Sequence, residues 1–172
     1  LDVVDSESLG LALSYFENFE ADDGGFLHRN IRPGIGTDPW QHGVPTSGPD
    51  AAASGTKVWA TNLSGNYPDR VLARLVSPEI ELPVGSFPIL KFQHFLQTEE
   101  NGGAGFLELS VDGGPFGPLP FVGSFSGSVI GSPYKEFQAR LSAFVGRTVR
   151  IGFLFITSRR FNSGEMESGW YI

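Results

Sequence analysis

Short runs of alternating apolar and polar residues, separated by glycine and proline, constrain this chain more than any other feature of its sequence. Leu107, Leu109 and Val111 alternate with Glu108 and Ser110, and an Asp-Gly-Gly hairpin signal follows at 112–114. The 172 residues include 23 Gly and 12 Pro, which divide the chain into many short segments. We find no convincing long helix and no internal repeat. The pattern therefore predicts an all-β domain with two sheets packed as a sandwich.

About eight to ten strands are expected at this spacing. The expected ranges are 11–19, 40–44, 57–63, 70–82 with a break at Pro78, 87–99, 104–111, 148–158 and 167–172. The range 135–146 fits either one short helix or a strand and a loop, and we favour the strand.

The stretch from Ser54 to Arg70 shows the alternation in detail. Val58 and Ala60 share one face of the expected strand, and Trp59 shares the other face with Thr61. We expect Trp59, like Trp40 and Trp170, to pack in the core, because large aromatic side chains dominate core energetics. Residues 64–69 are rich in turn formers and are expected to close this strand.

Charge and composition exclude several classes of function. The net charge of −7 argues against a nucleic-acid partner, since such partners require Lys and Arg against phosphates. The sequence has no Cys, and no apolar stretch approaches the 18 residues of a membrane span, so we expect neither thiolate metal sites nor membrane insertion.

The sequence pattern also predicts domain boundaries. We assign residues 1–10 to a linker or to the remnant of a preceding domain, and residues 11–172 to one sandwich domain whose last strand is truncated. Leu1 as first residue and a single Met indicate a processed piece of a longer product.

The sequence contains few candidate catalytic residues and no catalytic motif that we recognise. We therefore predict that the chain is not an enzyme. Its three histidines are His28, His42 and His94, and none stands in the H-E-x-x-H pattern of zinc peptidases. No G-x-S-x-G nucleophile turn occurs. His94 and His42 lie in strand-like runs and are interpreted as structural.

Segments rich in oxygen-bearing side chains are better candidates for a functional site, and they indicate calcium binding. Ca²⁺ binds carboxylate, amide and carbonyl oxygens. Glu20 in the acidic stretch 19–25, Asp38, and the amide of Asn62 could supply such ligands, although a solvated loop is the simpler interpretation of the acidic stretch alone.

Sugar binding would instead require an exposed aromatic ring beside polar groups. Tyr67, in the turn next to Pro68, is the candidate ligand-binding residue, and Phe121 is a second aromatic residue that a glycan could reach.

Seven stretches together resemble a known family. They are "YFENFEADDGGF", "DPWQHGVPTSGP", "SGTKVWATNLSGNY", "LVSPEIEL", "ILKFQHFLQTE", "FLELSVDGG" and "SGWYI", which span Tyr15 to Ile172. In this order they are similar to the MAM-type domains found beside bacterial secreted peptidases of the immune-inhibitor-A kind, and more distantly to cleaved-adhesin domains.

The resemblance implies a two-sheet antiparallel jelly roll with an accessory, non-catalytic role. It also implies a structural Ca²⁺, with Glu20 and Asp38 at the matching ligand positions, whereas Asn62 is chosen only from its spacing. Two departures weaken the metal site. Ala52 and Ala53 stand where the family usually has Asp-His, and the chain stops at Ile172, before the acidic pair that ends the family's last strand.

The leading hypothesis is a binding or adhesion module of a secreted or cell-surface bacterial multidomain protein. Its partners would be a protein or glycan surface ligand and adjacent domains of the same polypeptide. One alternative is a carbohydrate-binding module. The other is an assembly domain that packs on a neighbouring domain or subunit through an apolar patch along Phe116–Phe125.

Overall fold

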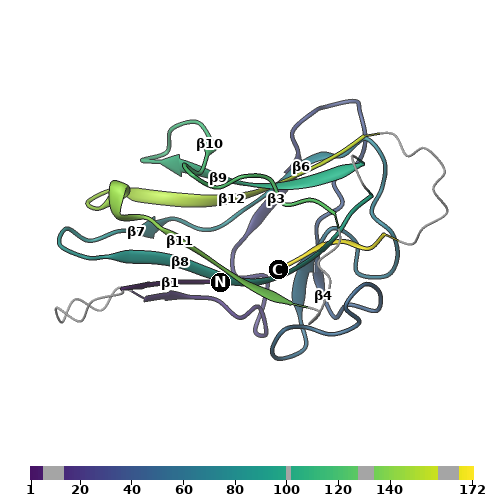
Figure 1. The fold of residues 1–172 in the computed structure, drawn as a ribbon, viewed down its shortest axis with the longest axis horizontal. Helices are drawn as coiled ribbons and strands as arrows, with labels where there is room; N and C mark the ends of the chain where they lie inside the picture. Colours follow the sequence, from purple (N-terminus) through teal and green to yellow (C-terminus); the bar gives the residue numbers. More distant parts are fainter. Residues whose placement is uncertain (6–13, 100–101, 128–133, 159–166) are drawn as a thin grey trace.

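The computed structural model describes residues 1–5, 14–99, 102–127, 134–158 and 167–172. In this part of the chain two antiparallel sheets face each other and no α-helix occurs, which confirms the predicted all-β sandwich and agrees with a jelly roll (Figure 1). One turn of 3-10 helix, η1 (Ser142–Phe144), lies between the last two long strands.

The first sheet has seven strands. Its order is β2 (Ser14–Phe16), β1 (Asp2–Asp5), β8 (Pro88–Gln97), β13 (Gly169–Tyr171), β5 (Val58–Ala60) and β4 (Gln41–Gly43), and β11 (Lys135–Arg140) pairs with β8. β8 is the central strand, because it pairs with β1, β13 and β11.

The second sheet has six strands. Its order is β10 (Gly117–Pro118), β9 (Gly103–Val111), β12 (Thr148–Thr157), β6 (Leu72–Val76) and β3 (Leu27–Asn30), and β7 (Ile80–Glu81) pairs with β12. The break between β6 and β7 falls at Pro78, as predicted.

Alternation along β8 sends every second side chain into the space between the sheets. Leu90, Phe92, His94 and Leu96 are buried, whereas the residues between them are at least partly exposed. The β5 pattern is also confirmed, since Trp59 lies in the main core while Val58 and Ala60 belong to a smaller cluster with Tyr171.

Trp170 occupies the centre of the core. Its ring contacts those of Trp40, Phe125 and Phe153, with centroid distances of 6.0, 5.6 and 5.6 Å. Phe153 belongs to β12, so this cluster joins the two sheets. The three tryptophans are buried, as expected.

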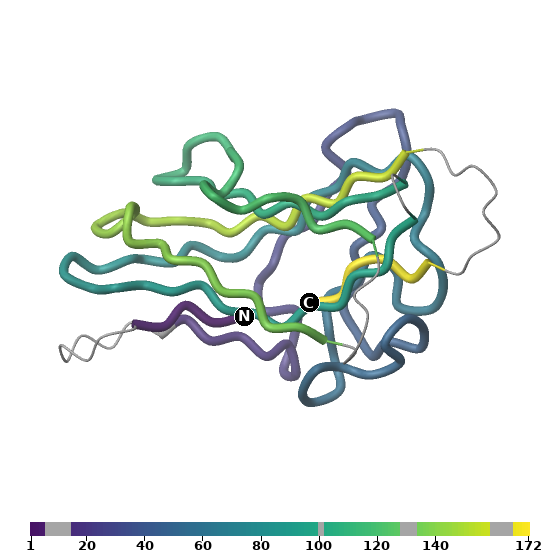
Figure 2. Tube along the Cα trace, in the orientation of Figure 1, coloured from purple at the N-terminus to yellow at the C-terminus, as the bar shows by residue number. Residues whose placement is uncertain are grey.

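The N-terminal range departs from the expected domain boundary. Residues 1–10 were assigned to a linker or domain remnant, but β1 lies inside the sandwich and pairs with both β2 and β8. Residues 6–10 of that range lie outside the described part. In Figure 2 the first and last described residues lie close together, and Ile172 belongs to the core.

Candidate functional site

Glu20, the first expected metal ligand, is held by the segment that precedes β5. Its Oε1 accepts hydrogen bonds from the backbone N–H groups of Lys57 (2.7 Å) and Thr56 (2.8 Å), and its Oε2 accepts one from the Thr56 hydroxyl (2.8 Å). These donors lower the pKa of the Glu20 carboxyl, the Lys57 N–H most. The Lys57 ammonium donates to the Glu20 carbonyl (2.8 Å). Glu20 therefore connects the segment that follows β2 to the segment that precedes β5.

Asp38, the second expected ligand, pairs with a histidine. Its Oδ2 lies 2.8 Å from His28 Nδ1, and its Oδ1 accepts a hydrogen bond from the Trp40 N–H at 3.2 Å. The His28 ring in turn lies 5.1 Å from that of Trp59. These two contacts hold residues 38–40 in place directly before β4.

Asn62, the third expected ligand, closes the turn after β5. Its amide oxygen accepts a hydrogen bond from Ser64 N–H (3.1 Å), and its amide nitrogen donates to the Asn66 carbonyl (2.9 Å). In the described ranges no three or more His, Cys, Asp or Glu side chains gather where a metal ion could bind. The calcium site at Glu20, Asp38 and Asn62 stays a prediction.

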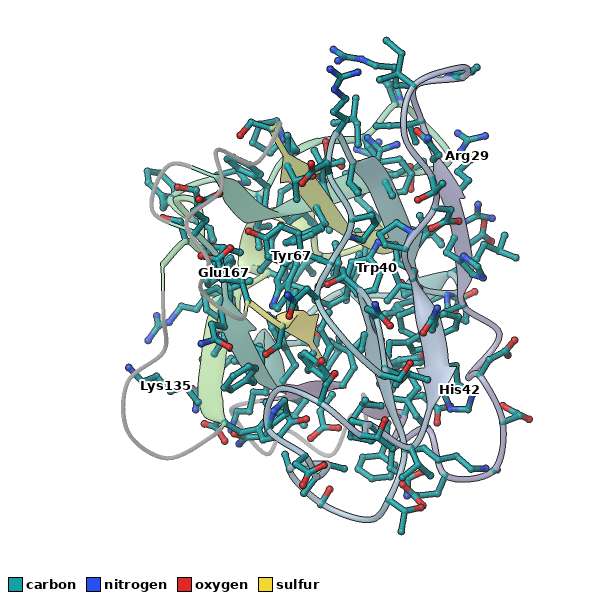
Figure 3. All side chains as sticks on the ribbon, turned by 90° about the vertical axis from the view of Figure 1, so that its right-hand side faces the viewer. Arg29, Trp40, His42, Tyr67, Lys135 and Glu167 are labelled. Carbon is teal, nitrogen blue, oxygen red and sulfur yellow. The ribbon has the colours of Figure 1, made fainter. Side chains whose placement is uncertain are left out.

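Tyr67 requires a correction, because we expected it to be exposed and it is 2% exposed. Its hydroxyl donates to Glu167 Oε2 (2.8 Å) and accepts from the Glu99 N–H (3.1 Å), and its ring packs edge-on against Phe155. Glu167 is buried as well, and Figure 3 labels both residues in the view onto this end of the sandwich. The turn formers around Tyr67 indicate a turn but not the direction of the ring. That direction is set by partners far away in the sequence.

A small cleft lies on the outer face of the seven-stranded sheet. It has a volume of about 160 Å³, and its lining includes Leu1, Phe16, Lys91, Gln93, Glu136 and Ile172. Phe16 is 67% exposed. The cleft thus combines aromatic rings, among them the exposed Phe16, with polar and charged side chains of both signs.

A larger hollow lies beside the loop that follows β10. It has a volume of about 360 Å³ and is formed by residues 120–125 facing residues 137–140 of β11. The Phe121 ring is fully exposed, with a relative exposure of 108%. Gln138 and Arg140, which carry an amide and a guanidinium group, also line this hollow, and the Gln138 amide donates to Glu136 Oε1. An aromatic ring beside planar hydrogen-bonding groups is the combination that sugar recognition requires.

The loop around Phe121 is anchored on both sides, whereas Phe121 itself projects outward. Leu119 is buried, and Phe125 forms two backbone hydrogen bonds with Gly105, both 2.8 Å long. Between them Phe121 has a φ of +63°, in the left-handed region. Such a conformation costs a non-glycine residue about 1–2 kcal/mol. The conformation belongs to a turn with Pro120 and Phe121 at its centre, closed by the Val122 N–H and the Leu119 carbonyl (3.3 Å), and this turn presents the ring to solvent.

No protein-family model matches this chain. The resemblance to MAM-type domains therefore stays a prediction.

The chain is similar to one region of a bacterial protein. It is 28% identical over 162 residues to Bacillopeptidase F of Bacillus subtilis (strain 168), and the alignment covers 94% of this chain but 10% of that protein. The chain thus spans about a tenth of the length of this relative.

The structure is also similar to a solved carbohydrate-binding module, TmCBM61 in complex with β-1,4-galactotriose. The TM-score is 0.52 and the sequence identity is 16%, with 91% of each chain covered. At this identity the likeness shows a shared fold.

Proposed function

We propose that the chain is a glycan-binding accessory module and that Phe121 is its stacking platform. The observation that carries the proposal is the fully exposed Phe121 ring, held in a left-handed backbone conformation beside Gln138 and Arg140. The apolar face of a sugar ring can stack on an aromatic side chain while neighbouring polar groups bind its hydroxyls. The fold shared with TmCBM61 supports this alternative over general protein adhesion.

The segment 116–125 supports a sugar site better than a broad assembly surface. An assembly surface would need a contiguous apolar patch. Leu119 is buried, Phe116 lies under the Arg74 guanidinium at 4.4 Å, and Phe125 packs on the core. Phe121 is the one large apolar side chain of this segment that is exposed.

The proposed setting is a secreted or cell-surface bacterial protein with further domains. The similarity to part of Bacillopeptidase F supports a module that accompanies a catalytic domain and holds it near a glycan surface. In this proposal the module itself performs no catalysis. No helix of the described residues is long and apolar enough to cross a membrane.

Binding to a panel of oligosaccharides tests the proposal. The panel contains β-1,4-galactotriose, neutral gluco- and xylo-oligosaccharides, and uronic-acid oligosaccharides, which the Arg140 guanidinium would favour. Titration calorimetry should detect binding to at least one of them, and Phe121→Ala should weaken it at least tenfold, or about 1.4 kcal/mol. A native-like melting temperature would show that the variant is folded.

Phe16→Ala is the matched control, because Phe16 is an exposed aromatic residue on the other candidate surface. It should leave the affinity unchanged. If Phe16→Ala removes binding and Phe121→Ala does not, the cleft on the seven-stranded sheet is the site. Absence of binding across the panel would refute the glycan function and favour a protein ligand.

A further inference from the structure

The outer face of the six-stranded sheet is largely apolar, although it points away from the core. Alternate residues of its strands, such as Leu75 and Phe153, are buried between the two sheets. The residues between them face outward, on the upper side of the upper layer in Figure 1. On β8 and β11 of the other sheet, the outward residues include the polar Lys91 and Gln138. On the six-stranded sheet, six outward side chains, all at least partly exposed, form what we call the apolar face: Leu27, Leu72, Val76, Phe106, Leu154 and Ile156.

The apolar face is continuous, because its strands pair in register. Leu72 lies opposite Ile156, and Leu154 lies opposite Phe106. Leu27, which is 67% exposed, extends the face onto β3. Residues directly opposite each other in antiparallel strands have Cβ atoms about 5 Å apart, close enough for side-chain contact. The face crosses β3, β6, β12 and β9, which gives it a width of about 14 Å and, along the length of β6, a similar extent.

Two arginines lie opposite each other within the apolar face. Arg29 of β3 pairs in register with Arg74 of β6, and like charges in such pairs destabilise a sheet. The Arg74 Nε donates to Glu108 Oε2 at 2.6 Å, and Glu108 is the one carboxylate among the outward residues of β3, β6, β9 and β12. Arg29 is exposed, and no carboxylate of the described residues pairs with it. The apolar face therefore carries a positive charge without a partner, although the net charge of the chain is −7.

The cations of the apolar face are arginines and not lysines. The three lysines of the sequence, Lys57, Lys91 and Lys135, lie in the other sheet or directly before one of its strands. Protein interfaces are enriched in Arg and depleted in Lys, because the guanidinium group is weakly hydrated and binds a carboxylate through two parallel hydrogen bonds. Aliphatic residues, a phenylalanine and arginines together are thus typical of a surface that another polypeptide covers.

The charge and the size of the apolar face select one kind of partner. Two copies of this chain packed through the face would bring their unpaired positive charges together. Two folded proteins also bury about 800 Å² each in a stable interface, whereas the apolar face measures only about 200 Å². An α-helix has a diameter of about 10–12 Å and fits a face about 14 Å wide, and a helix packed on a sheet is a common layer arrangement. A carboxylate on that helix would neutralise Arg29.

We propose that the apolar face binds an acidic amphipathic helix of a second protein. The aliphatic side chains of the helix pack on Leu72, Leu154 and Ile156, and a Glu or Asp beside them pairs with Arg29. The glycan site proposed at Phe121 is formed by residues 120–125 and 137–140, so the two sites share no residue. The helix therefore gives the module a protein partner in addition to the proposed glycan.

Three synthetic peptides of about 20 residues test the proposal, a length at which a helix is stable enough to form on binding. The first has leucine along one helical face and glutamate on the other. The second replaces every glutamate by lysine, and the third replaces every leucine by glutamine. Fluorescence anisotropy of the labelled peptides should show that the protein binds the Leu/Glu peptide at least tenfold more tightly than either of the others. Equal binding of the Leu/Lys or the Gln/Glu peptide, or no binding of the Leu/Glu peptide, overturns the proposal.

Matched variants locate the binding on the apolar face. Arg29→Glu should weaken the Leu/Glu peptide at least tenfold, whereas Lys135→Glu, the same charge change at an exposed position of the other sheet, should leave it unchanged. Leu154→Gln should also weaken binding, and Val84→Gln is its control, because Val84 is 79% exposed in the turn before β8. Melting temperatures show that each variant is folded, and Arg29→Glu decides the test if Leu154→Gln is not. Equal effects of Arg29→Glu and Lys135→Glu overturn the proposal.

Discussion

At the scale of single residues, His94 shows how the fold changes an ordinary side chain. It is 6% exposed, and its Nδ1 accepts a hydrogen bond from the Trp170 indole N–H at 3.3 Å. Burial, with a smaller effect of the Lys135 charge, lowers the pKa of His94 to about 4. The sandwich thus favours the neutral ring.

The depressed pKa of His94 predicts an acid-dependent loss of stability. Between pH 6.5 and about 4 the unfolded chain binds a proton at this residue that the folded chain does not. The free energy of unfolding therefore falls as the pH decreases through this window, by about 3 kcal/mol from this residue. The free energy of unfolding is measured in urea at a series of pH values for the wild type and for His94→Gln, which retains a hydrogen-bond acceptor but does not titrate. Plotted against pH, the two curves should converge towards pH 4. Parallel curves would contradict the prediction.

Glu20 leads to a second prediction at this scale, which separates its hydrogen bonds from a bound cation. Glu20→Ala removes the acceptors of Thr56 and Lys57, so we expect a lower melting temperature in EDTA as well as in calcium buffer. Asp22→Ala is the control, because this exposed carboxylate accepts from Gly24 N–H in its own turn. A calcium-dependent rise in the wild type that is lost in Glu20→Ala would instead assign Glu20 to a metal site.

At the scale of elements, alternation was the reliable guide. It predicted β5, β8, β9 and β12, because one face of each strand packs against the core. β3 was missed: the backbone groups of Leu27–Asn30 pair with β6, but its side chains are mostly exposed and Leu27 is itself 67% exposed. The side chains of an exposed edge strand do not alternate between core and solvent, so the sequence has no apolar pattern that marks the strand.

The candidate site was only partly predictable for a related reason. Phe121 could be named as an accessible aromatic residue, but its left-handed backbone and its neighbours on β11 come from tertiary packing. Tyr67 was misplaced because the residues that bury its hydroxyl, Glu99 and Glu167, lie 32 and 100 positions away. Local sequence predicts turns and strands, but contacts between residues distant in sequence decide which side chains are exposed.

Gly105 on β9 tests one close contact between the sheets. A Cβ atom there would lie 2.6 Å from Cζ3 of the Trp170 ring, which must then move. We expect Gly105→Ala to lower the free energy of unfolding by about 1–3 kcal/mol through overpacking. Gly103→Ala on the same strand is the control, since its Cβ would make ordinary contacts from 3.4 Å outward. Equal effects of the two substitutions in urea unfolding would show that Trp170 has room to shift.

At the scale of the whole molecule, the seven-stranded sheet is built from strand pairs that are distant in sequence. β1 pairs with β8, and β13 pairs with β5. Loop closure must therefore precede most of the stabilising contacts, and sandwiches of this kind fold slowly, in about milliseconds to seconds. Because the buried side chains of both sheets form one core cluster, we expect that neither sheet is stable without the other.

Tryptophan fluorescence should therefore report the loss of the entire fold in one step. Trp40, Trp59 and Trp170 are at most 2% exposed and belong to one core cluster, and Trp170 contacts Phe153 of the opposite sheet. If the sheets separate only when both unfold, the red shift of the emission and the loss of the far-ultraviolet β-sheet signal must follow the same urea curve. A fluorescence transition that precedes the circular-dichroism transition would show that the sheets can part while each keeps its strands, and that the Trp170 cluster does not couple them.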